Sequence, residues 1–536
     1  PFYITTLNNL AALYFDRGSY EQAEPLYQQA LELRKKTLSE QHPSYALSLN
    51  NLGTLYFAIG QFEKAALFFR KALDIRKAVY GEKHFDYANS LNDLAAVYEK
   101  QKQFDQAEKL YLQAMGIRRM VYGENHNDYA TSMNNLASLY VNTGQYRRAE
   151  ELVLAANAIW KKNLSDNNPI IALGLNNLAA VYRKWQVKPQ QAEQLYLGSI
   201  EKRNKILGAD HPLTASTEND LALLYMNLER YDEAEPLLLS SSGKTTRSLQ
   251  ASFPVLSEKE KSAFISENIF FNDCNNSFLF QHQKASASIL KNNISLQLFF
   301  KSLSLSDTRN MLDFIRNSKD QGIQQLIADW KSVRTLLAAQ YALPASKRIK
   351  DLAEKETMAE NLEKELSRKS AVFREKQSAL RVSINNVQVA MDTDEVAIEF
   401  VRFNFYHKKW TDSIIYAAYI LNKKDPVPVF IPLCEESQLA KLFDSAGHTA
   451  TSMVNNFYRG AELKSKSAAS NLGKELYQLI WAPLEPYLKE KKKVSYSPAG
   501  KLFSIAFHAL RVDSNKLLMD QYQLRQFTGI RQIALR

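Results

Sequence analysis

The strongest constraint on this chain is an internal repeat of 42 residues in its first half. Six segments share one pattern, beginning with LNNLAALY at 7–14 and ending with ENDLALLY at 218–225. Their apolar positions follow a helical period and do not alternate, which indicates amphipathic helices and excludes propeller blades of similar length. The closing tyrosines are spaced by 42, 42, 42, 42 and 43 residues, and they are Tyr14, Tyr56, Tyr98, Tyr140, Tyr182 and Tyr225.

A second helix is predicted after each of these segments. An alanine recurs nine residues after most of the tyrosines, and a turn glycine such as Gly18 often stands between the two. Some repeat boundaries carry His-Pro, as at 42–43, and proline suits the first turn of a helix. Residues 1–240 are therefore predicted to form a solenoid of six helix pairs. Because Pro1 coincides with a repeat boundary, we expect further repeats to precede it in the natural protein.

The six units resemble tetratricopeptide repeats of the long kind found in kinesin light chains. This resemblance covers residues 1–240 and rests on the six copies of the Leu-Asn-Asn-Leu-Ala pattern in register. It implies a right-handed superhelix with a concave groove that is lined mainly by the first helix of each pair. A protein or peptide partner is expected in that groove.

An asparagine recurs in the first helix of every repeat. The resemblance implies that such asparagines face the groove and hydrogen-bond an extended peptide backbone. The alternative is that each one satisfies the backbone of a neighbouring helix. The row consists of Asn8, Asn50, Asn92, Asn134, Asn176 and Asn219.

A second row consists of arginines in the second helices, and tryptophan replaces one member. Such a row could bind acidic side chains of a peptide, or it could form a solvated helix face with local ion pairs. The tryptophan could anchor a peptide or simply pack in the solenoid. The members are Arg34, Arg76, Arg118, Trp160 and Arg203.

The composition supports a helical intracellular protein. Gly (17) and Pro (15) are scarce, and two cysteines exclude a disulfide framework and a zinc site built from cysteines. No apolar run is long enough to span a membrane, and no signal peptide is visible. We therefore predict a cytoplasmic protein with no cofactor, no metal and no membrane contact.

Charge is divided unevenly along the chain. Residues 1–240 carry 26 Lys+Arg and 27 Asp+Glu, whereas residues 241–536 carry 42 and 30. The second half is thus strongly basic. Such a balance is compatible with nucleic-acid binding, although no recognition motif is present, and a lysine-coated helical surface is the alternative.

The middle of the chain, residues 241–390, is predicted to be a helical linker. The polar segment 237–248, with its Ser-Ser-Ser-Gly run, indicates a break at the end of the repeats. Segments 258–318 and 320–343 are predicted helices, and 347–382 is predicted to be one long charged helix.

Residues 391–536 change to an α/β pattern. The β-branched and aromatic runs at 395–403, 413–421 and 427–433 predict strands, and NFYHKKWTD at 404–412 suits the connection of a hairpin. Helices are expected from about residue 436 and over 473–488. The segment 492–500 is predicted to be a strand that ends in a Pro-Ala-Gly turn.

These segments together resemble the first half of a CHAT domain, the caspase-like peptidase domain that often follows tetratricopeptide repeats in bacteria. The most specific stretch is SYSPAGKLFSIAFHAL, and PVFIPLCEESQL and LYQLIWAPLEPYL also match. The fold expected for the chain is therefore mainly α: a superhelical solenoid, a helical bridge and a partial α/β caspase-like domain.

The resemblance implies a cysteine protease with a His-Cys dyad, in which histidine raises the thiolate fraction of the nucleophile. No His-Gly pair is present, so the dyad is expected beyond residue 536. Cys434 and His508 are the weak candidates within this chain. Glu435 and Glu436 next to Cys434 disfavour a thiolate there. A Cys434–His508 pair stays open as an alternative.

The chain is accordingly predicted to be the regulatory, non-catalytic part of a caspase-like protease in bacterial antiviral defence or programmed cell death. By analogy, a gasdermin-like effector is a plausible substrate. The alternative is a non-enzymatic scaffold with a degenerate CHAT remnant. Arg536 is either a processing site or an arbitrary end, and the activating ligand, cleavage specificity and oligomeric state are not predicted.

Overall fold

The structure is a computed structural model that describes residues 2–16, 20–252, 258–301, 320–341, 343, 348–349, 351–376, 383–446, 469–513 and 516–535. Pro1 and Arg536, on which the predictions about the chain ends depend, lie outside these residues. The chain forms two compact units: residues 1–228, 240–268 and 308–373 make the first, and residues 229–239, 269–307 and 374–536 make the second. Among the described helices, none is long and apolar enough to cross a membrane.

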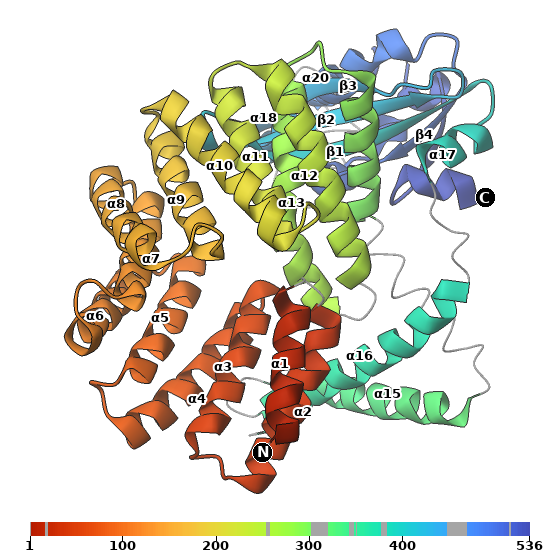
Figure 1. The fold of residues 1–536 in the computed structure, drawn as a ribbon. Coiled ribbons are helices and arrows are strands. Elements are labelled where there is room, and N and C mark those ends of the chain that lie inside the picture. Colours follow the sequence, from red (N-terminus) through yellow and green to blue (C-terminus); the bar gives the residue numbers. More distant parts are fainter. Residues whose placement is uncertain are drawn as a thin grey trace. The chain divides into compact units, whose positions relative to one another are not determined.

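The first unit contains the predicted helix pairs, except that residues 229–239 at the start of the last helix belong to the second unit; the pairs of the first unit stack one after another in Figure 1. The mainly helical fold class is confirmed. In the first five repeats the first helix packs on its own second helix. From the second repeat on, each first helix also packs on the second helix of the preceding repeat, and first helices of neighbouring repeats contact one another. The first helices therefore line the inner curve of the stack. The pairs are α1 (Phe2–Asp16) and α2 (Tyr20–Thr37), α3 (Pro43–Ala58) and α4 (Phe62–Tyr80), α5 (Phe85–Lys100) and α6 (Phe104–Tyr122), α7 (Asn127–Asn142) and α8 (Tyr146–Asn163), α9 (Pro169–Trp185) and α10 (Pro189–Leu207), and α11 (Pro212–Asn227) and α12 (Tyr231–Ser252).

Histidine at the repeat boundary is an N-cap. In His84 the ring Nδ1 accepts a hydrogen bond from the backbone N–H of Asp86 at 3.2 Å, which satisfies one of the free donors at the start of α5. Asn168 does the same for α9 with its side-chain oxygen. The boundary residue therefore ends one repeat and begins the next. The other histidines with this role are His42, His126 and His211.

The break predicted over 237–248 is wrong, because α12 runs without interruption from Tyr231 to Ser252. Its polar residues are satisfied inside the unit. Lys244 forms a buried ion pair with Glu218 of α11, with 2.5 Å between Nζ and Oε1. Thr245 donates its hydroxyl hydrogen to the carbonyl of Ser241 one turn earlier. The predicted solenoid boundary at residue 240 therefore falls inside a helix.

The middle of the chain forms shorter helices than predicted. α13 (Glu258–Gln281) ends well before residue 318, and a second helix occupies 287–301. The rest of the predicted segment, 302–318, lies outside the described residues. α15 (Gln321–Tyr341) and α16 (Leu352–Lys376) belong to the first unit and pack on each other through apolar side chains such as Ile327 and Leu366.

The second unit contains a five-stranded sheet in the order β3-β2-β1-β4-β5. β1, β2 and β3 are antiparallel neighbours, whereas β4 and β5 run parallel to β1. The strands predicted at 395–403, 413–421, 427–433 and 492–500 are present. Their bounds are β1 (Glu395–His407), β2 (Lys409–Asn422), β3 (Val429–Glu435), β4 (Lys493–Ser497) and β5 (Gln523–Gln526).

The connection predicted over 404–412 is wrong in length. β1 and β2 continue through it, His407 pairs with Lys409, and Lys408 alone makes the turn at φ 59°. The helix predicted over 473–488 is also divided, into α20 (Ala469–Ile480) and a 3-10 segment from Ala482 to Tyr487. Pro483 and Pro486 cannot donate helical hydrogen bonds, which explains the change.

Helices cover both faces of this sheet. Val396, Ile398 and Phe400 of β1 share a core with α18 (Glu436–Ala446) and α20. On the opposite face, Tyr419 of β2 donates its hydroxyl hydrogen to Asn276 of α13 at 2.6 Å. Because both faces are covered, residues 395–401 of β1 and 415–421 of β2 are buried without alternation.

Candidate protein-binding surface

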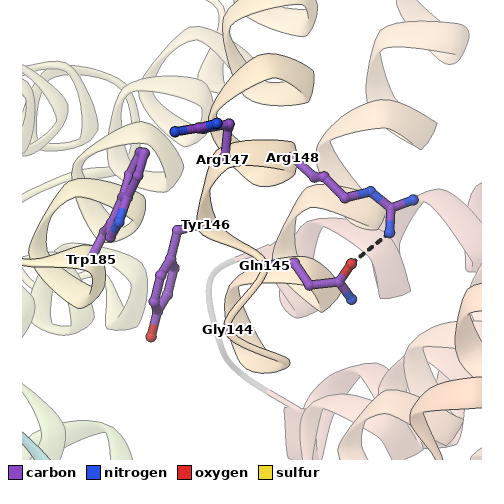
Figure 2. A pocket seen from close by; sticks show the side chains of 6 residues that line it. All are labelled: Gly144, Gln145, Tyr146, Arg147, Arg148 and Trp185. Atoms are coloured by element: carbon purple, nitrogen blue, oxygen red, sulfur yellow. Dashed lines mark hydrogen bonds between the residues drawn. The ribbon is translucent and has the colours of Figure 1, made fainter.

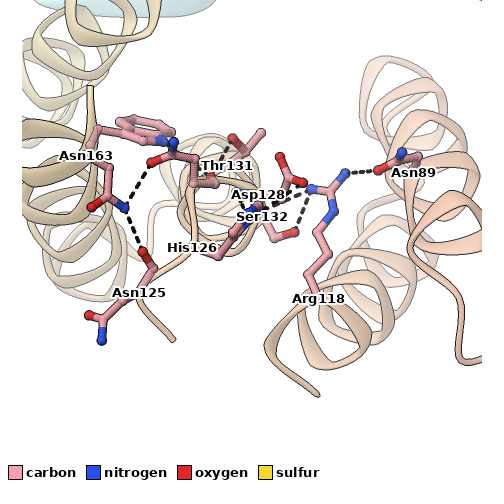
Figure 3. Close-up of polar contacts among 10 residues, drawn as sticks. Asn89, Arg118, Asn125, His126, Asp128, Thr131, Ser132 and Asn163 are labelled. Atoms are coloured by element: carbon pink, nitrogen blue, oxygen red, sulfur yellow. Dashed lines mark hydrogen bonds and ion pairs between the residues drawn. The ribbon is translucent and has the colours of Figure 1, made fainter. Parts of the chain in front are cut away.

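The predicted arginine row is buried between repeats and does not form an open face. Arg118 of α6 is 6% exposed, and its guanidinium donates to the Ser132 hydroxyl at 2.8 Å and to the Asp128 carbonyl at 3.2 Å in α7. Figure 3 shows this contact together with that to Asn89. Burial lowers the pKa of each guanidinium, to about 10 for Arg203. These side chains therefore join one repeat to the next. The equivalent pairs are Arg34–Ser48, Arg76–Ser90 and Arg203–Thr217.

Trp160 packs inside the solenoid, where it is 1% exposed. Its indole Nε1 donates to the Asn127 carbonyl at 3.3 Å, at the start of α7, so it joins the two helices of one repeat. The position that holds serine or threonine opposite each arginine holds Gly174 opposite this tryptophan. A Cβ at residue 174 would lie 2.0 Å from Asn157 Oδ1 and 3.2 Å from Trp160 Cε3. Trp160 and Gly174 are thus a matched pair that replaces an arginine–serine pair.

The asparagine row links first helices to one another through side chains. Asn51 donates to Asn8 at 2.7 Å, Asn135 to Asn92 at 2.9 Å and Asn177 to Asn134 at 3.0 Å. These bonds join side chain to side chain. They are therefore different from the bonds to a peptide backbone or to a helix backbone that the sequence suggested for this row. Of the remaining members, Asn50 donates to Asp93, Asn176 accepts from Thr217, and Asn219 is fully buried.

The inner curve carries a polar network that the sequence patterns did not predict. Asn142 of α7 donates to Glu99 of α5 at 2.7 Å and accepts from Lys184 of α9 at 3.0 Å. Glu99 also accepts from Tyr111 and Ser138. The signal available was the repeat spacing, since residues 99, 142 and 184 occupy neighbouring positions at the ends of successive first helices.

Burial changes the acidity of both charged groups in this network. It raises the pKa of Glu99 and lowers the pKa of Lys184, and the nearby Arg183 lowers the latter further. The charged groups of Glu99 and Lys184 are therefore partly desolvated, and the neutral side-chain amide of Asn142 lies between them. Such groups on a curved face are candidates for partner binding.

A second polar feature lies along the edge where the two helices of each repeat are joined. A glutamate in one second helix accepts from the tyrosine 32 residues later, as in Tyr56–Glu24, Tyr140–Glu108 and Tyr225–Glu193, each at 2.9 Å. Beside the Tyr140 pair, a hollow of about 390 Å³ is open at the surface. Figure 2 shows its lining, in which Tyr146 and Trp185 stack with ring centres 6.3 Å apart.

The weak catalytic candidates lie apart from any such network. Cys434 is 6% exposed in the apolar core of the second unit, and burial raises the pKa of its thiol to about 12. His508 is exposed in a short 3-10 segment. Among the described side chains, no hydrogen bond joins these two residues. Cys274 is also fully buried.

We expect Cys434 to be unreactive in the native protein. At pH 8 a thiol of this pKa is ionised in about one molecule in ten thousand. Iodoacetamide should therefore label neither cysteine in the folded chain within a time that modifies both in denaturant, as measured by intact mass. Rapid labelling of Cys434 in the native protein would instead indicate an activated nucleophile.

Three segments, residues 2–78, 86–162 and 170–242, match the family model described as tetratricopeptide repeat. The first part of the chain thus matches tetratricopeptide repeats, a kind of unit that implies protein–protein interaction.

Solved structures with similarity include BtubC (BKLC) from P. vanneervenii, at 29% identity over 38% of this chain and 81% of that one, with a TM-score of 0.32. A putative kinesin light chain from Podosopora anserina with nearly identical TPR-like repeats is 26% identical over 38% and 95%, with a TM-score of 0.30. The apo form of RapI is 15% identical over 57% and 97%, with a TM-score of 0.37. No curated protein matches the sequence.

Proposed function

We propose that the inner curve of the third to fifth repeats binds a protein partner through the network of Glu99, Asn142 and Lys184. The observation that carries this proposal is the bridging amide of Asn142 between two partly desolvated charges of opposite sign. A peptide strand carries donors and acceptors along its backbone, so it can replace the contacts of Asn142 and use both charges.

We further propose that this chain is the regulatory part of a caspase-like CHAT cysteine protease whose His-Cys dyad lies beyond residue 536. The α/β arrangement of the second unit supports this, because β4 lies parallel to the central β1 and ends at Pro498-Ala499-Gly500, the most specific stretch of the resemblance. Burial raises the pKa of the Cys434 thiol, which also supports a catalytic nucleophile other than Cys434. The protease would act in bacterial defence or programmed cell death, with a gasdermin-like effector as substrate.

The alternative function is a non-enzymatic scaffold. It is favoured by the same buried cysteines and by the match of the repeats alone to a family model. The two functions differ in one respect that can be measured, namely whether the full-length protein generates new protein ends in the cell.

The test uses the full-length protein expressed from its native gene, with mass spectrometry of newly formed protein termini. For the protease, new termini appear and are lost when the cysteine after the next core strand is replaced by alanine, whereas Cys434→Ala retains them. Lys184→Glu should suppress them, and Lys205→Glu, an exposed control on α10, should not. If no termini depend on any cysteine, the scaffold is correct. If Cys434→Ala abolishes them, the nucleophile is within this chain.

A further inference from the structure

A helix from outside the repeats is docked on the edge of the first two repeats. Lys364 of α16 places its Nζ 2.5 Å from Glu24 Oε1 and 5.6 Å from the centre of the Tyr56 ring. One turn earlier, Glu360 of α16 forms an ion pair with Lys64 of α4. All of these residues belong to the first unit. Two charges of α16 spaced by one helical turn therefore meet two opposite charges of the repeats.

The burial of these pairs shows that the contact is tight. The side chains of Lys364 and Glu24 are 3% and 4% exposed, and those of Lys64 and Glu360 are 17% and 12% exposed. Ion pairs of this kind are strongly orientation-dependent, because each charge has left water and depends on its partner. The opposite side of α16, including Leu362 and Leu366, packs on α15.

The residues that bind α16 have equivalents 84 residues later in the chain, and among the described residues no contact of α16 with these equivalents is seen. Glu108, Tyr140 and Arg148 stand at the positions of Glu24, Tyr56 and Lys64. Tyr140 donates to Glu108 at 2.9 Å, as Tyr56 does to Glu24. Here Arg148 lies over the Tyr140 ring, 4.0 Å from its centre, as Lys64 lies over the Tyr56 ring at 5.1 Å, and no counterpart of Lys364 is seen among the described residues. Its side chain is 55% exposed, and that of Glu108 is 33% exposed.

We propose that the edge made by Glu108, Tyr140 and Arg148 is a docking site for a helix of a protein partner, and that this helix carries an acidic residue followed four residues later by a lysine or arginine. The partner's basic group would lie beside the Tyr140 ring and pair with Glu108, as Lys364 does with Tyr56 and Glu24. Arg148 would turn to the acidic residue, as Lys64 does to Glu360. Tyr146 and Trp185, at the adjacent hollow in Figure 2, supply aromatic contact area of the kind found at binding hot spots.

A peptide of residues 352–376, the sequence of α16, is the probe. It is labelled with fluorescein and titrated with the full 536-residue chain, whose own α16 already occupies the first site. Fluorescence anisotropy should show saturable binding. Glu108→Lys or Arg148→Glu should weaken this binding by at least about tenfold. Arg119→Glu, an equal charge change at an exposed site on α6, should leave it unchanged.

Reversing the charge on both sides of the proposed pair, Lys364 of the peptide and Glu108 of the chain, makes the test specific to that pair. A peptide with Lys364→Glu should bind the Glu108→Lys chain more tightly than it binds the original chain. Lack of binding at about 1 mM peptide would overturn the proposal. So would binding that is lost with Glu24→Lys and kept with Glu108→Lys, because the peptide would then be exchanging with α16. Lys184→Glu tests the inner-curve site and should not change binding of the α16 peptide at Glu108. The inner-curve proposal and this proposal can therefore fail separately.

Discussion

Replacement of Lys301 by methionine is expected to reduce the local stability of the second unit by about 3–5 kcal/mol. The Lys301 Nζ forms an ion pair with Glu399 of β1 and donates to the Ser497 hydroxyl at 2.8 Å and to the Pro498 carbonyl at 2.9 Å. Glu399 is fully buried, and its second oxygen accepts from the Ile530 amide at 3.0 Å. Methionine leaves this carboxylate without its cation, and it leaves the Ser497 hydroxyl and the carbonyls of Phe400 and Pro498 without this donor.

The loss should be visible as faster hydrogen exchange in β1 and β4, measured by mass spectrometry, because exchange reports the opening of each segment separately. The matched control is the double variant Lys301→Met/Glu399→Gln. Its amide still accepts from Ile530 but carries no charge, so it should be more stable than Lys301→Met alone. A loss below about 1 kcal/mol, or a double variant that is less stable than the single one, would contradict this account.

The second large effect is expected from Gly174→Ser, which should destabilise the solenoid by about 2–4 kcal/mol. The added Cβ would lie 2.0 Å from Asn157 Oδ1 and 3.2 Å from the Trp160 ring. Asn157 also donates to the Gly174 carbonyl at 3.1 Å, so it cannot move away without losing that bond. In other repeats the position of Asn157 holds leucine, methionine or isoleucine, that of Trp160 holds arginine, and that of Gly174 holds serine or threonine.

The triple variant Asn157→Met/Trp160→Arg/Gly174→Ser restores that combination and should recover most of the lost stability. Thermal unfolding followed by circular dichroism compares the two variants, and Ser132→Gly provides the converse change beside Arg118. If Gly174→Ser is as stable as the original chain, or if the triple variant is less stable than the single one, the three residues are not a matched set.

The repeats were predictable because their information is local and occurs six times. The first and second helices, their turns and their His-Pro boundaries all follow from apolar periodicity and capping residues within one unit. The strands of the second unit were predictable for the same reason, since β-branched runs mark them. The polar segment 237–248 misled because its serine and threonine hydroxyls are satisfied within α12, which composition does not reveal.

The roles of the side chains at the surface of each repeat were much less predictable. Periodicity placed the arginine row on one side of the second helices, but it did not show that the next repeat would cover it. The asparagines likewise had known positions and unknown partners, because side-chain bonds such as Asn51–Asn8 depend on how closely two repeats approach.

The sequence by itself determined the helix pairs, their register and the change to an α/β unit, because each depends on residues a few positions apart. Only the tertiary structure decided that Lys364 meets Glu24 across 340 residues, and that the equivalent edge at Glu108 is open. The physical reason is that a charged side chain is encoded locally, whereas its burial and its partner depend on which distant helix packs against it.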